Sequence, residues 1–266
     1  MAVVDEPNQE AIAVLHPGEM GAAVATCLVA AGHGVLWVSD GRSGPTAARA
    51  REAGLADAGT IDEAAARATV ILSICPPHAA LDVARAVRGF SGCYVDANAV
   101  SPRTASEVAG VVEAAGGTYV DGGIIGPPPV ASGSTRLYLS GNQADMVRAL
   151  FDGTALDARI VASGGPYGAS AVKMAYAAWT KGSAALLLAA RELGEACGVS
   201  DSLLSEWALS QPALADRLAS AAQSAAKKGW RWIAEMEQIA ATMKAADLPP
   251  GFHQAAAEIY RRSADS

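Results

Sequence analysis

The stretch that most constrains this chain is residues 11–21, with the sequence AIAVLHPGEMG. Its apolar residues predict a short buried strand, its glycines predict a turn, and a helical pattern follows from about Gly21. A strand that turns through glycine into a helix leaves the first N–H groups of that helix unpaired at the turn. These groups, together with the positive end of the helix dipole, suit a phosphate.

The turn partly matches the dinucleotide-binding pattern G-x-G-x-x-G, with His16, Gly18 and Gly21 at the three glycine positions. Histidine is among the few residues enriched at positive φ, so His16 is compatible with a tight turn. Gly18 would let the backbone approach a pyrophosphate, and Gly21 would let the helix pack closely on the strand. The alternative is an ordinary strand–helix turn, since short glycine motifs also occur by chance. The residues expected to bind a cofactor here are His16, Gly18, Glu19, Met20 and Gly21.

A second strand is expected over residues 35–38, which completes a strand–helix–strand crossover unit. In a dinucleotide fold, the loop that follows binds the adenosine ribose. Asp40 in this loop suits the 2′-hydroxyl of NAD. Arg42, with the hydroxyls of Ser43 and Thr46, suits the 2′-phosphate of NADP. The alternative is a polar surface loop; we favour NADP, because a guanidinium with two hydroxyls outweighs one carboxylate that can turn to solvent.

Further short apolar runs predict strands near residue 55 and over residues 69–74, 94–96, 118–121, 136–140 and 159–161, with helices between most of them. This alternation predicts a doubly wound parallel sheet, in which loops at the carboxyl ends of the strands line the ligand crevice. The loop with Cys75 and Pro76, after the strand at residues 69–74, is one of these, so we expect it to face the cofactor. The strand at residues 118–121 is expected to run into a loop that begins with Gly122 and Gly123.

From Gly168 onward the pattern changes to alanine- and leucine-rich helices, the first over about residues 170–197. The expected fold class is α/β, a Rossmann-type doubly wound sheet followed by an all-α C-terminal domain. The expected divisions are a flexible N-terminus (1–10), a dinucleotide-binding domain (11–165) and a helical substrate and dimerisation domain (166–266).

Composition excludes several classes of function. The net charge of −7 and the lack of a basic stripe argue against nucleic-acid binding. Cys27, Cys75, Cys93 and Cys197 show no C-x-x-C spacing and no nearby histidine cluster, so we expect reduced thiols and no metal site. No secretory leader and no apolar segment of bilayer length is evident. A soluble cytoplasmic protein without a membrane partner is expected.

With these pieces in place, the chain resembles the β-hydroxyacid dehydrogenase superfamily, which includes 6-phosphogluconate and 3-hydroxyisobutyrate dehydrogenases. The resemblance covers nearly the full length, and is narrower to a 6-phosphogluconate dehydrogenase NAD-binding-like subgroup with a distinct helical C-terminal domain. The matching pieces are Gly18, Met20 and Gly21, the Gly32-His33 helix stop, Asp96-Ala97-Asn98 through Pro102, Asp121-Gly122-Gly123, and residues 168–173.

The resemblance implies hydride transfer between NAD(P) and a hydroxy or keto acid, with the active site between the two domains and a homodimeric assembly. Apolar helices too numerous for one lobe to cover also favour a dimer. In the family, the lysine at the position of Lys173 is the general acid/base, a role that requires burial to lower its pKa. A lysine that extends from an apolar helix to solvent is the alternative.

Several positions depart from the family pattern. The asparagine usual one turn after the lysine is replaced by Tyr176 and Ala177, and Asn98 and Ala99 replace a serine and a threonine. Ile125 replaces a further substrate-loop serine. These changes weaken the case for a small hydroxy acid and make a bulkier or less polar substrate plausible. The residues expected to bind substrate are Asn98, Gly122, Gly123, Tyr176 and His253, the last from a loop, and Asn98 is also expected to meet the cofactor.

Two other functions remain open. Imine reductases share this architecture but usually replace the lysine with another proton donor, so Lys173 counts against that function and Tyr176 supports it. The altered positions, with His16 in the glycine turn, also leave open a cofactor-binding protein with little catalysis.

Overall fold

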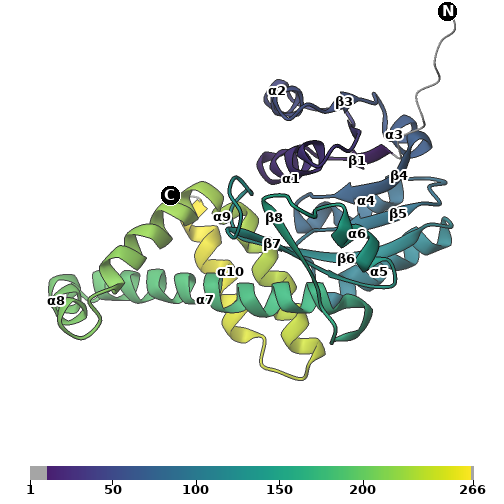
Figure 1. Ribbon diagram of the computed structural model, residues 1–266. Coiled ribbons are helices and arrows are strands. Elements are labelled where there is room, and N and C mark those ends of the chain that lie inside the picture. Colours follow the sequence, from purple (N-terminus) through teal and green to yellow (C-terminus); the bar gives the residue numbers. More distant parts are fainter. Residues whose placement is uncertain (1–10, 265–266) are drawn as a thin grey trace, which may run out of the picture. The chain divides into compact units, whose positions relative to one another are not determined.

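The computed structural model describes residues 11–264, and in this range eight strands form a single sheet (Figure 1). The strands are β1 (Ala11–Val14), β2 (Val35–Trp37), β3 (Ala56–Asp57), β4 (Ala68–Ser73), β5 (Cys93–Asp96), β6 (Thr118–Ile125), β7 (Thr135–Ser140) and β8 (Leu156–Ile160). Their order is β3-β2-β1-β4-β5-β6-β7-β8. Neighbouring strands are parallel except β6 and β7, which are antiparallel.

Helices connect the strands and continue beyond the sheet. They are α1 (Glu19–Ala30), α2 (Gly44–Glu52), α3 (Ile61–Arg67), α4 (Ala80–Ala86), α5 (Pro102–Ala114), α6 (Ala144–Ala149), α7 (Gly168–Ala196), α8 (Ser200–Ser210), α9 (Leu214–Ala245) and α10 (Gly251–Ala264), with short 3-10 turns η1 (Pro77–Ala79) and η2 (Gly165–Tyr167). The predicted fold class, a Rossmann-type sheet followed by an all-α region, is confirmed.

The sheet is covered on both faces, as its alternating side chains require. Ile12 and Val14 of β1 belong to the core on one face, to which α1, α2 and α6 also contribute buried residues. Ala13 between them points to the other face, where α3, α4 and α5 supply the buried residues. The strand order reverses between β1 and β4, the point at which doubly wound sheets bind ligands beyond the carboxyl ends of their strands.

Local capping explains where several helices begin. Ser43 accepts a hydrogen bond from Thr46 N at the start of α2 (3.4 Å), and Ser101 caps α5 in the same way. Thr60 and Glu63 form a reciprocal capping box at α3. These helix starts follow from residue types that are visible in the sequence.

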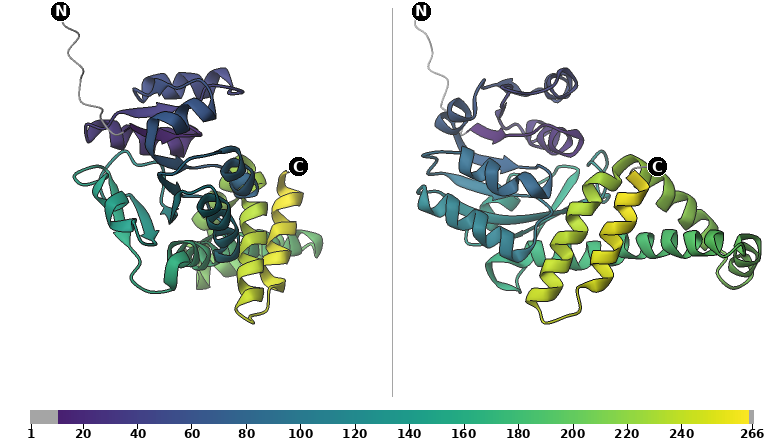
Figure 2. Two further views of the ribbon diagram at one scale, coloured as in Figure 1. Left: turned by 90° about the vertical axis from the view of Figure 1, so that its right-hand side faces the viewer. Right: turned by 180° about the vertical axis from the view of Figure 1, so that it is seen from behind.

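The chain divides into two compact units, the first ending at Lys173 and the second beginning at Met174. In the second unit α9 and α10 run side by side (Figures 1 and 2). The ammonium of Lys181 forms an ion pair with Glu235 between α7 and α9, and the Tyr260 hydroxyl donates to Lys181 O (2.6 Å). Both charged side chains are largely buried, so each depends on its partner.

Comparison with the expected elements shows two differences. Helix α6 was not anticipated. The prediction that Gly122 and Gly123 begin a loop is wrong, because both lie inside β6 and pair with Leu139 and Tyr138 of β7. The predicted division between residues 165 and 166 stays a prediction, and the expected flexible segment 1–10 lies outside the described residues. Within residues 11–264, no helix is long and apolar enough to cross a membrane.

Candidate functional site

The turn between β1 and α1 is tight. Gly18 N donates to His16 O (2.8 Å), and Ala22 N donates to Gly18 O (2.8 Å). A Cβ at Gly21 would lie 2.2 Å from His16 O, so only glycine fits there. His16 does not have a positive φ, so this turn needs no left-handed residue at the first glycine position. The histidine is therefore compatible with the turn.

The N-terminus of α1 has room for a ligand. Among residues 11–264, no side chain caps the helix, and a Cβ at Gly18 would meet nothing within 4 Å. Glu19 is exposed in the first turn, and Met20 packs partly against the core beneath it. Uncapped N–H groups with open space before them form an anion-binding arrangement.

Arg42 reaches this turn from the loop after β2. Burial and, to a smaller extent, the nearby charge of Arg42 together lower the pKa of His16 to about 4. Burial also lowers the pKa of Arg42 itself. Neither His16 Nδ1 nor Arg42 Nε has a hydrogen-bond partner within the described part of the chain, although both atoms are buried. Such unpartnered polar atoms are rare unless a ligand or water completes them.

A second arginine, which the sequence analysis did not select, supports the same region. Arg49 on α2 donates to Pro17 O in the glycine turn (3.3 Å) and to Thr46 Oγ1 (3.1 Å). Ser43 Oγ and Thr46 Oγ1 lie 3.1 Å apart at the start of α2, whereas Asp40 is exposed. In the sequence Arg49 is indistinguishable from an ordinary surface arginine, because its partner Pro17 is remote along the chain.

The ends of β4 and β5 are tied together by Asn98. Its Oδ1 accepts from Cys75 N (2.5 Å), and its Nδ2 donates to Ser73 Oγ (3.1 Å). Burial raises the pKa of the Cys75 thiol to about 12, so this group is not a thiolate nucleophile at neutral pH. Asn98 and Cys75 thus hold the loop before the half-buried Pro76 in a fixed position.

Lys173 lies against β6. A Cβ at Gly123 would lie 3.1 Å from Lys173 Cβ and 2.9 Å from Ala169 O, so the missing side chain lets α7 approach the strand. The Lys173 amine donates to Ile124 O (2.7 Å). Burial lowers the pKa of Lys173 to about 8. The lysine does not extend freely into solvent.

Close contacts link this lysine to the nucleotide-side residues. A Cβ at Gly122 would lie 3.0 Å from Asp96 O and 3.3 Å from Ala97 Cα, so β6 meets the end of β5 there. Ala97 precedes Asn98, which bonds to Cys75, and the charge of Arg42 acts on Cys75 in turn. Lys173, Asn98, Cys75, Arg42 and His16 therefore lie along one edge of the sheet.

Tyr176 and His253 belong to the second unit. Tyr176 is exposed on α7. The expectation that His253 sits in a loop is wrong: it lies in the first turn of α10, is 5% exposed, and its Nε2 lies 3.3 Å from Ala178 O. The connection before it is short, because α10 already begins at Gly251.

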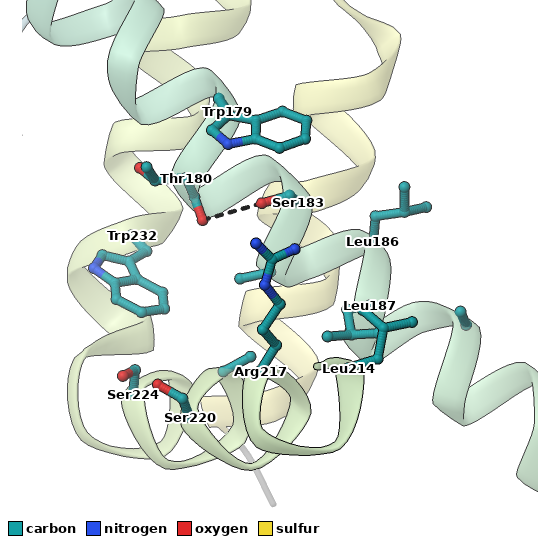
Figure 3. Close-up of a pocket in the computed structure, with 13 residues that line it drawn as sticks. Trp179, Thr180, Ser183, Leu186, Leu187, Leu214, Arg217, Ser220, Ser224 and Trp232 are labelled. Atoms are coloured by element: carbon teal, nitrogen blue, oxygen red, sulfur yellow. Dashed lines mark hydrogen bonds between the residues drawn. The ribbon is translucent and has the colours of Figure 1, made fainter. Parts of the chain in front are cut away.

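The second unit also contains a groove of about 510 Å³ between α7 and α9 (Figure 3). Trp179 and Leu186 line it from α7, while Trp232 lines it from α9. Arg217 extends into the groove from α9 (Figure 3). The sequence analysis did not predict this groove.

The residues of the first unit fit a dinucleotide. The fit rests on the uncapped start of α1, the open space at Gly18, and the unpartnered nitrogens of His16 and Arg42. Among residues 11–264, no group of three or more His, Cys, Asp or Glu side chains is placed to hold a metal ion. Fold and site together define a nucleotide-binding α/β protein with a helical second unit.

Comparison with known protein families supports this class of protein. Residues 11–157 match the NAD binding domain of 6-phosphogluconate dehydrogenase, and residues 195–263 match a domain of unknown function, DUF1932. The chain belongs to the 6-phosphogluconate dehydrogenase NAD-binding family, within the β-hydroxyacid dehydrogenase superfamily. It is an oxidoreductase that binds a nicotinamide cofactor. None of the curated protein sequences matches it.

Solved structures show the same fold. One is a conserved protein of unknown function described as similar to 3-hydroxyacid dehydrogenases, with 26% identity, a TM-score of 0.69, and coverage of 96% of this chain and 97% of that one. A Mycobacterium tuberculosis 3-hydroxyisobutyrate dehydrogenase has 20% identity, a TM-score of 0.70, and coverage of 97% and 94%. An imine reductase from Pseudomonas sp. has 22% identity, a TM-score of 0.57, and coverage of 95% and 93%.

The two glycines of the turn make separable predictions. Gly21→Ala should destabilise the fold by about 1–3 kcal/mol, because its Cβ overlaps His16 O. Gly18→Ala should fold normally but lose about tenfold or more in nucleotide affinity, because its methyl group enters the space before α1. Urea denaturation and NADPH fluorescence titration measure the two effects.

Gly34→Ala is the matched control, since a Cβ there also meets nothing within 4 Å and lies outside the turn. Unchanged nucleotide affinity in Gly18→Ala would contradict the placement of the phosphates.

Proposed function

We propose that this protein is an NADP-preferring oxidoreductase that transfers a hydride between the nicotinamide and a hydroxy or keto acid. In this proposal Lys173 is the general acid/base. The observation that carries it is the Lys173 amine, half-buried on β6 with its pKa lowered to about 8, along the sheet edge that fits the nucleotide.

Lys173 has the properties that proton transfer requires. With a pKa near 8, its amine exists in both protonation states close to neutrality. Its present acceptor, Ile124 O, is a neutral carbonyl, so a substrate hydroxyl can replace it without breaking an ion pair. In the oxidation direction the neutral amine takes the substrate hydroxyl proton, and in reduction the ammonium returns it to the carbonyl oxygen. A nicotinamide held at this site would accept or supply the hydride.

The nucleotide would be held by residues of three loops. The N–H groups at the start of α1 suit the pyrophosphate, with Gly18 giving it access. Arg42, whose Nε lacks a partner, suits a 2′-phosphate, and Arg49 adds a second positive charge nearby. The exposed Asp40 is free to turn away, which supports NADP over NAD.

Three positions that depart from the family pattern support a proposal for the substrate class. Ile125 is buried, Ala99 carries no polar group, and the Asn98 amide is committed to Cys75 and Ser73. These features support a substrate with more apolar surface than a small hydroxy acid. Contacts from Gly122, Gly123, Tyr176 and His253 stay predictions. Imine reduction is the less favoured activity, because Lys173 is present and the likeness to the imine reductase concerns the fold alone.

We further propose a homodimer assembled through α7. Exposed and half-exposed positions on this helix recur at alternating spacings of three and four, as in a coiled-coil seam: Tyr176, Trp179, Ser183, Leu186, Ala190 and Leu193. Trp179 and Leu193 are 70% and 65% exposed in the single chain. Four of these positions also line the groove of Figure 3, which suits a helix of a second copy. The four free cysteines support a reducing, cytoplasmic location.

Lys173→Arg tests the acid/base role. Arginine keeps the charge and hydrogen-bond donors but does not deprotonate, so turnover should fall by about 100- to 10,000-fold while NADPH affinity stays nearly unchanged. In the wild type, oxidation should accelerate as pH rises through about 8, and reduction should slow over the same range. Steady-state rates across a panel of hydroxy acids, keto acids and cyclic imines provide the measurement. Full turnover in Lys173→Arg would exclude the role.

Arg42→Ala tests the cofactor preference. Loss of a charged hydrogen bond to the 2′-phosphate should weaken NADPH binding by about 10- to 100-fold and leave NADH binding unchanged. Fluorescence titration with both nucleotides measures this, with Arg51→Ala, an exposed arginine on the neighbouring helix α2, as the control. Equal losses for the two nucleotides would contradict recognition of the 2′-phosphate.

Trp179→Glu tests the assembly. A charge in the apolar seam should convert the dimer to a monomer, because it replaces a large apolar contact between the copies with a carboxylate that loses its hydration. Light scattering should give twice the chain mass for the wild type and for Val130→Glu, an equally severe change at a residue 88% exposed outside the seam. A monomeric wild type would disprove the dimer.

A further inference from the structure

Asp121 is fully buried, at 0% exposure, on the strand that Lys173 contacts. Its Oδ2 accepts from Ser170 N (2.8 Å), and its Oδ1 accepts from Ser170 Oγ (2.5 Å). Ser140 Oγ on β7 lies 3.0 Å from Asp121 Oδ2 and accepts from Ala169 N (3.0 Å). The carboxylate therefore binds the first turn of α7 both directly and through Ser140.

This arrangement suits an ionised carboxylate. Burial raises the pKa of Asp121, but the hydrogen bonds from Ser170 and Ser140 oppose that rise. The start of α7 adds the positive end of its dipole. The neighbouring carboxyl, Asp96, pairs in register with Asp121, and burial raises its pKa to about 7. Asp96 is thus the group of the pair that takes up a proton near neutrality, with the Tyr119 hydroxyl 3.4 Å from its Oδ2.

The same short segment of β6 holds α7 at two points. At one end Asp121 fixes Ser170, and at the other Ile124 O accepts from the Lys173 amine. Ser170 and Lys173 are three residues apart, so they lie on the same face of the helix. Between the two points, Gly123 removes the side chain that would push Ala169 and Lys173 away. The position of the amine therefore depends on how firmly the first turn of α7 is held.

We propose that Asp121 is a positioning residue for Lys173: its carboxylate anchors the first turn of α7 on β6 and so keeps the lysine amine against the strand and away from water. The catalytic importance of this anchoring rests on the proposed acid/base role of Lys173, whereas the anchoring itself does not. Asp121 itself touches no reacting atom. It acts through Ser170 and the helix.

The test measures the pKa of Lys173 directly, without a substrate. Full-length protein is acetylated with trace acetic anhydride across a pH series, and mass spectrometry gives the extent of labelling at Lys173. In Asp121→Asn the released turn should let the amine reach water, so its pKa should rise from about 8 toward its ordinary value of 10.5, by about 1 unit or more. Ser170→Ala should shift the pKa in the same direction by less.

The direction of the change in the Lys173 pKa distinguishes positioning by Asp121 from a direct effect of its charge. If Asp121 acted only through its charge, its removal would lower the pKa of Lys173, because a carboxylate stabilises the ammonium. A lower or unchanged pKa in both variants overturns the proposal. Asp157→Asn, which removes an exposed carboxylate paired with Arg159, is the control and should leave the pKa of Lys173 unchanged. If Asp121→Asn does not fold, Ser170→Ala decides the question alone.

The two proposals can fail separately. Full turnover in Lys173→Arg would remove the acid/base role, yet labelling would still report whether Asp121 holds the amine. Conversely, an unshifted pKa in Asp121→Asn would leave the catalytic role of Lys173 intact. Where turnover is measurable, the pH profile of kcat in Asp121→Asn should move upward with the labelling pKa.

Discussion

The site depends on close backbone contact at three glycines. Gly21 lies where a side chain would strike His16 O, Gly122 lies against Asp96 O, and Gly123 lies against Ala169 O. At Gly21 and Gly123 the two segments approach more closely than a Cβ allows, at Gly122 a Cβ would be tightly packed, and each contact lies near the carboxyl edge of the sheet. The first brings α1 onto β1, the second joins β6 to β5, and the third brings α7 and Lys173 onto β6. Larger residues there would separate the elements that carry the functional groups.

Two helix N-termini in the first unit have opposite environments. The start of α1 has no side-chain cap and opens onto free space at Gly18, whereas the start of α7 is bound by the buried carboxylate of Asp121. Both termini attract negative charge for the same physical reason. A terminus that supplies its own anion is held rigidly and does not need a ligand. One that lacks an anion is suited to bind a phosphate from solution.

Much of the fold was predictable, because it follows from local patterns. The apolar strand at residues 11–14, the glycine turn and Ser43 as a cap are visible in the chain itself. The errors concern residues whose environment is set by distant partners. Gly122 and Gly123 resembled a loop, but the first makes room for the end of β5 and the second for α7. His253 contacts Ala178 from the first turn of α10 instead of lying in a loop. Asp121 was not predicted as a site residue, because its partner Ser170 is distant in the sequence.

Asn98 shows why a departure from the family pattern changes more than one contact. Its Oδ1 accepts from Cys75 N and its Nδ2 donates to Ser73 Oγ. A serine side chain at this position is too short to make both hydrogen bonds. The side chain is 2% exposed, so it stabilises the ends of β4 and β5 and offers little surface to a ligand. A polar group that would otherwise face substrate has become part of the framework. With Ile125 buried nearby on β6, the polar contacts of any substrate at this edge then depend mainly on Lys173 and on backbone groups.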